Sequence, residues 1–139
     1  MRCVFVLLTA LGMIVSALAL REHYRSEDDL SPCKINEKWD CGTVNRSRYA
    51  MMWKLPVAAL GIGAYLFLCA IAFKRQWLAL LTAAIPSLIF SLYLTNIEQN
   101  ILEVWCLYCV ASLVIISTIT LLAAITTAVQ YFKPTPNTA

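Results

Sequence analysis

The chain has 139 residues, of which 60% are hydrophobic and 14% charged, a balance far from that of an ordinary soluble domain. Its length suits one domain better than two, and a net charge of only +3 gives no reason to expect a nucleic-acid partner. The charges are clustered, and they leave uncharged stretches at 3–20, 55–73, 76–97 and 104–132.

Each uncharged stretch supplies the ~20 apolar residues with which a helix crosses a hydrocarbon layer of about 30 Å. We therefore predict an integral membrane protein of the all-α class, a four-transmembrane-helix bundle whose single domain covers residues 1–131. Residues 132–139 form a polar tail with two prolines, which we expect to be disordered. An alternative for residues 1–20 is a cleaved secretory signal, because the stretch ends in "SALAL".

The distribution of charge predicts an orientation. Four spans place both termini on the same side as the short turn at 74–76, and the loop at 21–54 on the other side. The first side carries four basic residues and no acid, whereas the loop carries seven basic and six acidic residues. Because short loops rich in Lys and Arg remain cytoplasmic, we expect cytoplasmic termini and an extracytoplasmic loop. The seven basic residues of the loop argue in the opposite direction.

Two cysteine pairs lie outside the apolar cores. Cys33 and Cys41 are in the loop, and Cys106 and Cys109 form a C-x-x-C motif at the start of the fourth span. The first and third connections of a four-helix bundle emerge on one face, so both pairs should lie on one side of the membrane. An extracytoplasmic side would be oxidising, and disulfides would form and persist there.

The C-x-x-C pair suits electron transfer between water and the bilayer. Cys106 and Cys109 share a helix face, and Cys109 lies one turn deeper, about 4.5 Å at 1.5 Å per residue. Cys106 is therefore expected to face the aqueous loop, and Cys109 to face whatever lies in the bilayer. A helix N-terminus also stabilises a thiolate. The acceptor that is common in this layer is a quinone.

Simpler interpretations of the cysteines remain open at this point. Cys33 and Cys41 alone could form a static disulfide that staples the loop. The four cysteines could also bind zinc, although C-x₇-C is a poor match for half of a zinc site. Cys3 and Cys69 lie within apolar runs and are expected to behave as small hydrophobes. His23 receives no role.

The cysteine order resembles that of the vitamin K epoxide reductase family, with C-x₇-C between the first two spans and C-x-x-C opening the fourth. The resemblance covers residues 1–131. It is carried by "CKINEKWDCGTVNRSRY", by "LPVAALGIGAY" in the second span and by "YLTNIEQNILEVWCLYC" leading into the fourth.

This resemblance implies a redox relay. Cys33 would exchange electrons with a thioredoxin-like partner outside the cytoplasm, and Cys41 would attack Cys106. Cys109 would then be freed to form an adduct with a quinone of the menaquinone, ubiquinone or vitamin K type. Such an enzyme is a quinone-dependent thiol oxidoreductase that supports disulfide formation.

The quinone pocket is predicted less directly. Cys41, Asn45 and Tyr49 are spaced four apart and would share one face if that stretch were helical. The segment "NRSRYAMMW" at 45–53 is expected to form a short helix on the membrane surface. Asn45 would then donate a hydrogen bond near a quinone oxygen, although a turn or cap role is the simpler interpretation. Further candidates for the pocket are Val57, Leu60 and Leu113.

The chain also departs from part of the family. Members that reduce the epoxide have an Asn early in the second helix and a Tyr one turn after the C-x-x-C motif, where this chain has Val57 and Leu113. Epoxide reduction is therefore in doubt. The short length and the lack of a thioredoxin domain instead resemble a stand-alone bacterial homolog of the inner (plasma) membrane.

Two other functions are compatible with parts of the sequence. A DsbB-like quinone reductase has the same ingredients, but its C-x-x-C pair precedes its widely spaced pair, the reverse of the order here. A non-catalytic tetraspan membrane protein with a structural loop disulfide would leave the C-x-x-C motif at the helix start unexplained.

Overall fold

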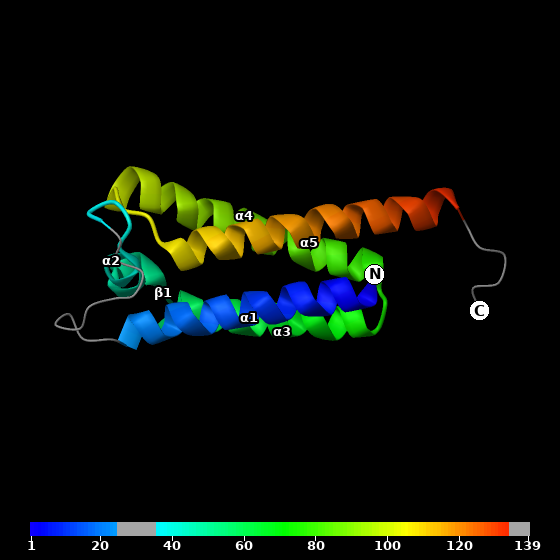
Figure 1. Cartoon of the computed structure of the whole chain (residues 1–139), viewed down its shortest axis with the longest axis horizontal. Helices are drawn as coiled ribbons and strands as arrows, with labels where there is room; N and C mark the ends of the chain where they lie inside the picture. Colours follow the sequence, from blue (N-terminus) through cyan, green and yellow to red (C-terminus); the bar gives the residue numbers. More distant parts are fainter. Residues whose placement is uncertain (25–35, 134–139) are drawn as a thin grey trace.

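The structure is a computed structural model that describes residues 1–24 and 36–133. The described part is a helical bundle. Two long helices, α1 and α3, pack closely and antiparallel, and a second antiparallel pair, α4 and α5, lies against them (Figure 1). Their bounds are α1 (Arg2–Tyr24), α3 (Val57–Phe73), α4 (Trp77–Ile97) and α5 (Leu107–Phe132).

The lengths and composition of these helices are those of a membrane bundle. Helices α1 and α5, and α4 together with the π-helical segment η2 (Glu98–Leu102) that continues it, are each long and apolar enough to cross a membrane. Helix α3 is equally apolar but has 17 residues, a length of about 25 Å. The expectation of a helical membrane bundle is confirmed, whereas a count of four spans stays a prediction.

Helix α5 begins three residues later than the uncharged stretch at 104–132. The reason lies in the backbone before the helix. Trp105 forms a β-bridge with Trp39, and Cys106, the N-cap, has extended φ and ψ of −106° and 120°. The C-x-x-C motif therefore straddles the helix start.

The predicted surface helix at 45–53 is wrong in its extent. A short helix, α2 (Cys41–Arg46), ends where Ser47 becomes extended and its hydroxyl donates to the Val44 carbonyl at 2.8 Å. A 3₁₀ turn, η1 (Arg48–Ala50), follows. The chain then forms a hairpin of two strands, β1 (Met51–Met52) and β2 (Leu55–Pro56). Positive φ at both turn residues gives the strands their tight reversal.

Close packing of α1 on α3 depends on small residues. A Cβ added at Gly12 would lie 2.3 Å from the Tyr65 ring, and one at Gly61 would lie 2.9 Å from the Ser16 hydroxyl. Tyr65 in turn reaches α5, where its hydroxyl donates to the Ser112 carbonyl at 3.0 Å. Such small residues let helix backbones approach closely in membranes, where no hydrophobic effect drives the helices together. Three helices are thus joined through one tyrosine.

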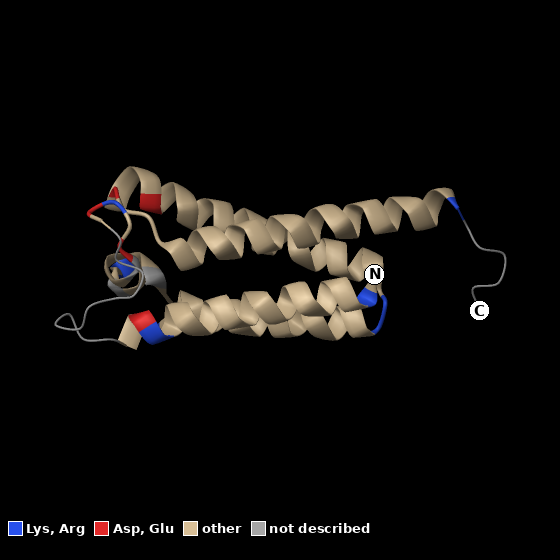
Figure 2. Ribbon diagram, viewed as in Figure 1, with Lys and Arg blue, Asp and Glu red and all other residues tan. Residues whose placement is uncertain are grey.

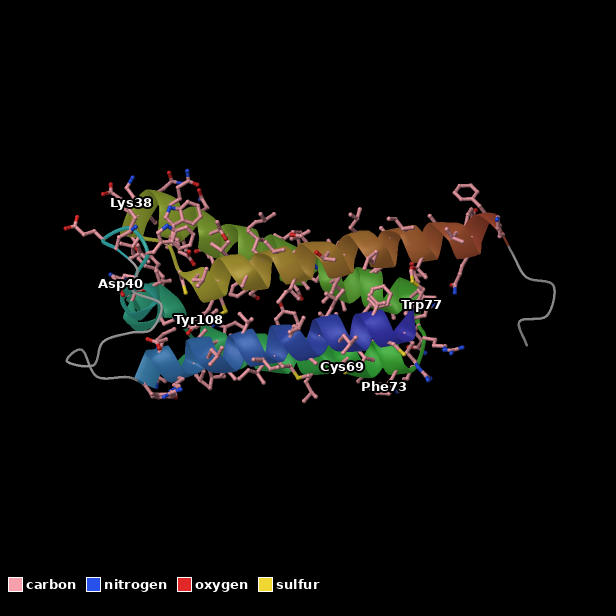
Figure 3. All side chains as sticks on the ribbon, in the orientation of Figure 1. Lys38, Asp40, Cys69, Phe73, Trp77 and Tyr108 are labelled. Carbon is pink, nitrogen blue, oxygen red and sulfur yellow. The ribbon has the colours of Figure 1, made fainter. Side chains whose placement is uncertain are left out.

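The bundle has two chemically different ends. The N-terminus, the turn between α3 and α4 and the end of α5 carry Lys and Arg, and the opposite end carries residues of both signs (Figure 2). Lys38 and Asp40 lie at that mixed end, whereas Cys69 lies towards the basic end (Figure 3). The segments that follow α1 and precede α5 are therefore at one end of the bundle. The disordered tail was predicted at 132–139, but α5 runs to Phe132, one residue beyond the predicted domain end. The role of Cys33 and the rest of the tail, from 134 on, lie outside the described residues.

We expect Gly12→Ala to lower stability, because the new methyl group collides with a tyrosine ring held between α1, α3 and α5. The loss should be on the order of 1–3 kcal/mol, as for an overpacked core. Thermal unfolding in detergent, followed by circular dichroism, measures it. Gly63→Ala is the matched control, since a Cβ there has no neighbour within 4 Å. Equal melting temperatures for the two variants would contradict this packing.

Candidate functional site

The loop segment before α2 is hydrogen-bonded to the segment before α5. Trp105 N–H donates to the Lys38 carbonyl at 2.6 Å, and Asp40 N–H donates to the Trp105 carbonyl at 3.0 Å. The two indole rings of Trp39 and Trp105 lie 6.1 Å apart, centroid to centroid. Asp40 directly precedes Cys41, and Trp105 directly precedes Cys106. The backbone thus brings the first residue of α2 beside the C-x-x-C motif.

Helix α2 covers Cys106. This thiol is fully buried and packs with Val44, and the Asn45 amide donates to its sulfur at 3.4 Å. The Asn45 carbonyl accepts a hydrogen bond from the Nδ1–H of His23, at the end of α1. Asp40 caps α2 by accepting from the Thr43 N–H. Cys106 faces the loop, as predicted, but it is shielded from water instead of facing it.

The surroundings of Cys106 favour its thiolate. A hydrogen bond from the Cys109 thiol lowers the pKa of Cys106 below the ordinary value, and the backbone N–H groups of Cys109 and Tyr108 act in the same direction. Burial and the charge of Glu98 oppose them without reversing the shift. Because Cys106 is the N-cap of α5, the two backbone N–H donors are amides of the first helical turn, which have no partner within the helix.

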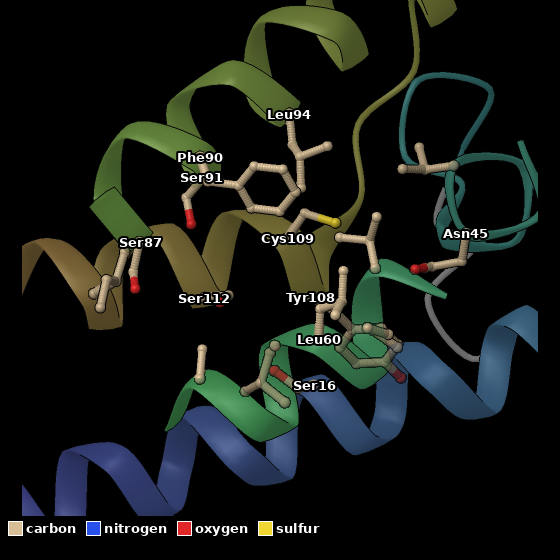
Figure 4. Close-up of a pocket in the computed structure, with 18 of the residues that line it drawn as sticks. Ser16, Asn45, Leu60, Ser87, Phe90, Ser91, Leu94, Tyr108, Cys109 and Ser112 are labelled. Carbon is tan, nitrogen blue, oxygen red and sulfur yellow. The ribbon is translucent and has the colours of Figure 1, made fainter. Parts of the chain in front are cut away.

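Cys109 opens onto a cavity of about 410 Å³ between the helices, a volume typical of small-molecule sites. Its sulfur points to the side where Asn45 lies (Figure 4). The wall is mostly apolar, with side chains from α3, α4 and α5 that include Leu60, Leu68, Phe90, Leu94 and Ile116. The two sulfurs of the motif therefore have different surroundings, one under the loop helix and one on the cavity wall.

Four of the five predicted pocket residues line the cavity, and the fifth does not. Asn45, Tyr49, Val57 and Leu60 all line the cavity. Leu113 does not line it and packs against the main hydrophobic core instead. One residue earlier, Ser112 takes the place on the wall that Leu113 was expected to fill. Tyr49 belongs to the 3₁₀ turn and not to α2, so it reaches the cavity without sharing a helix face with Asn45.

Glu98 is a functional candidate that the sequence analysis missed. It is the residue at which α4 gives way to the π-helical η2, and its side chain is only 2% exposed. One carboxylate oxygen accepts from the Cys106 N–H at 3.2 Å, and the other has no hydrogen-bond partner within residues 1–24 and 36–133. In the sequence Glu98 is one of two acids, with Glu103, between the third and fourth apolar runs, and it resembles an ordinary loop charge.

The remaining cysteines lie apart from this site. Cys3 is exposed in the first turn of α1, and Cys69 is half-buried in α3. Neither lines the cavity. That they behave as small apolar residues stays a prediction.

Comparison with known proteins gives one match. The model of the vitamin K epoxide reductase family matches residues 3–126, whereas no curated protein matches the chain. A match of this extent includes all of the helices but the end of α5. The chain therefore belongs to the vitamin K epoxide reductase family, and this membership implies a membrane thiol oxidoreductase linked to a quinone.

Proposed function

We propose that the chain relays electrons from a thioredoxin-like protein to a quinone, and so supports disulfide formation in exported proteins. Cys33 exchanges with the partner, Cys41 with Cys106, and the C-x-x-C pair with the quinone. Net oxidation of protein thiols fits a chain that has Val57 and Leu113 where epoxide-reducing members have polar groups.

One observation carries the proposal: the two thiols of the C-x-x-C motif face two different partners. Cys106 lies under α2, the helix that begins at Cys41, and Cys109 lies on the wall of the cavity. A disulfide relay needs this division, because one sulfur must meet another cysteine while its neighbour meets the acceptor.

The cavity fits a quinone as the acceptor. Its apolar wall suits a ring and an isoprenoid tail, and its volume lies within the range of small-molecule pockets. Leu60, Phe90 and Leu94 would contact the ring faces, and Asn45 and Tyr49 supply polar groups at the end near α2. When bound, the quinone accepts two electrons and two protons.

The exchange between the pairs proceeds through mixed disulfides. The partner's thiols reduce the Cys33–Cys41 disulfide, and the Cys41 thiolate then attacks the Cys106 sulfur of the oxidised motif. Cys109 leaves as a thiolate, and Cys33 attacks Cys41 to restore the loop disulfide and release Cys106 as a thiolate. The helix-start donors around Cys106 make it a good leaving group, because they stabilise its negative charge.

We further propose that all four long helices cross the bacterial plasma membrane, with the mixed end outside the cytoplasm. The basic end then lies in the cytoplasm, in agreement with the positive-inside rule. Helix α3 is short, but the apolar residues Leu55 and Pro56 precede it and lengthen the apolar segment. Local thinning of the bilayer accommodates a span that is slightly too short.

A trapped cross-pair intermediate tests the relay. In Cys33→Ala/Cys109→Ala, Cys41 and Cys106 have no resolving partners, so a disulfide between them should accumulate. Mass spectrometry of peptides from the purified variant detects this bond. Cys33→Ala/Cys106→Ala is the control, in which Cys41 and Cys109 should not join, because Cys109 lies on the cavity wall. Failure to trap the first pair under mild oxidation would refute the relay.

Substitutions in the two cysteine pairs should abolish different activities. Cys41→Ala should stop oxidation of a reduced thioredoxin-like protein, whereas a small dithiol should still drive quinone reduction through Cys106 and Cys109. Cys106→Ala and Cys109→Ala should each lower quinone reduction, followed by absorbance, to the uncatalysed rate with either reductant. Cys3→Ala and Cys69→Ala are the controls and should retain full turnover. Loss of activity in Cys69→Ala would overturn this division of the cysteines.

The proposed orientation predicts which end is labelled from outside. In a variant that lacks the six native cysteines, a cysteine at Glu37 should react with a membrane-impermeant maleimide in intact cells. A cysteine at Lys74, at the basic end, should react only after the cells are opened. The reverse pattern would show that the mixed end is cytoplasmic. Labelling of both positions from outside would show that α3 does not cross the membrane, and so exclude a bundle of four spans.

A further inference from the structure

We propose that Glu98 is a catalytic base and acid for the C-x-x-C pair, which takes the proton from the Cys109 thiol and passes it to the quinone. The inference rests on the proposed function, since it assigns a proton carrier to that reaction. It is drawn from the position of the carboxylate, which accepts a hydrogen bond from the Cys106 N–H and shares the cavity wall with Cys109.

The placement of Glu98 has a structural cause. The backbone is wound as a π-helix over Glu98–Leu102, and Glu103 then adopts a left-handed conformation with φ of 56°. This reversal turns the chain back, so that Cys106 begins α5 against the end of α4. Single π-helical turns are often found at functional sites. Here the irregular turn brings a carboxylate to the first turn of the next helix.

The two carboxylate oxygens have different surroundings. Oε2 accepts from the Cys106 N–H at 3.2 Å, so it fills the role of a helix cap. Oε1 is buried and has no hydrogen-bond partner in the described part of the chain. The carboxylate also interacts with the Cys109 thiol, and Glu98 lines the same cavity as Cys109. A cap alone needs only one oxygen, so capping does not account for the second.

Burial makes an idle carboxylate costly at this place. A carboxylate that is 2% exposed loses its hydration, and the one hydrogen bond from the Cys106 N–H compensates only one of its two oxygens. None of the described residues forms a salt bridge with it. A neutral glutamine would cap the Cys106 N–H equally well at a lower cost, so an ability to change protonation state explains the acid better.

The proton and electron balance is complete with this residue. After the relay, the Cys109 thiolate takes a proton from water, so the reduced motif holds a Cys106 thiolate and a Cys109 thiol. Glu98 takes the Cys109 proton, two electrons pass to the quinone as the Cys106–Cys109 bond forms, and Glu98 gives its proton to one quinone oxygen. The second oxygen takes a proton from water at the cavity mouth and leaves a hydroxide ion. The products are the disulfide, a quinol, hydroxide and the original carboxylate.

Glu98→Gln separates this role from capping, because glutamine keeps the acceptor but cannot carry the proton. With a small dithiol as reductant, kcat for quinone reduction should fall about 10²-fold, within the usual range for general acid–base catalysis. Glu103→Gln is the matched control, an exposed acid five residues along the same connection, and should match the native protein. A Glu98→Gln variant with full turnover would overturn the proposal.

A measurement without quinone provides a second readout. The reduced protein is alkylated over a range of pH, and peptide mass spectrometry follows Cys106 and Cys109. Loss of the negative charge beside the thiols in Glu98→Gln should move the midpoint of alkylation to lower pH, whereas Glu103→Gln should not move it. The other titratable side chains that line the cavity, Tyr49, Tyr65 and Tyr108, are unchanged in both variants. An unmoved midpoint would show that Glu98 shares no proton with the pair.

Glu98→Asp provides the opposite comparison. Aspartate can carry a proton but is one methylene shorter, so it is the poorer cap. A proton carrier predicts a higher rate for Asp than for Gln, and a cap predicts the reverse. If the Gln variant fails to reach the native melting temperature, Glu98→Asp and Glu98→Asn repeat the test at equal size. A native protein that does not reduce quinone would refute the proposed function and this role together, whereas a Glu98→Gln variant that reduces quinone as fast as the native protein would refute the role of Glu98 alone.

Discussion

The site depends on two backbone hydrogen bonds between segments that are distant in the sequence. Trp105 is bonded to Lys38 on one side and to Asp40 on the other. These bonds hold the start of α2 next to the start of α5. They therefore bring the backbone of Cys41 close to that of Cys106. Asn45, His23 and Glu98 then add side-chain contacts from α2, α1 and α4. Every long helix but α3 is therefore represented in the immediate surroundings of Cys106.

Helix α3 contributes in another way, by shaping the space beside Cys109. Its residues Leu60 and Leu68 form part of the cavity wall, and Gly61 allows α1 to approach. Tyr65 fixes the relation of α3 to α5 through Ser112. Packing in the middle of the bundle and chemistry at its end are thus connected, because the tyrosine that joins the helices also lines the cavity.

Much of this arrangement could be predicted from the sequence, since uncharged runs mark the helices and the parity of four helices puts both cysteine segments at one end. The different surroundings of Cys106 and Cys109 also followed from helical spacing. The role of Leu113 and the extent of the loop helix could not be predicted in this way. Both depend on where a helix starts or stops, and here Ser47 and the Trp39–Trp105 bridge decide it. Glu98 was missed because burial of a lone acid is a tertiary property.

The cover over Cys106 has a consequence for selectivity. With no surface in contact with water, this sulfur is closed to a bulky thiol carried by another protein, whatever the reactivity of that thiol. In the proposed relay the donor to Cys106 is Cys41, which begins the covering helix itself and so needs no access from outside that helix. The inner pair would then need no means of recognising and rejecting other protein thiols. In that relay, steric exclusion alone would direct the thiols of other proteins to the loop.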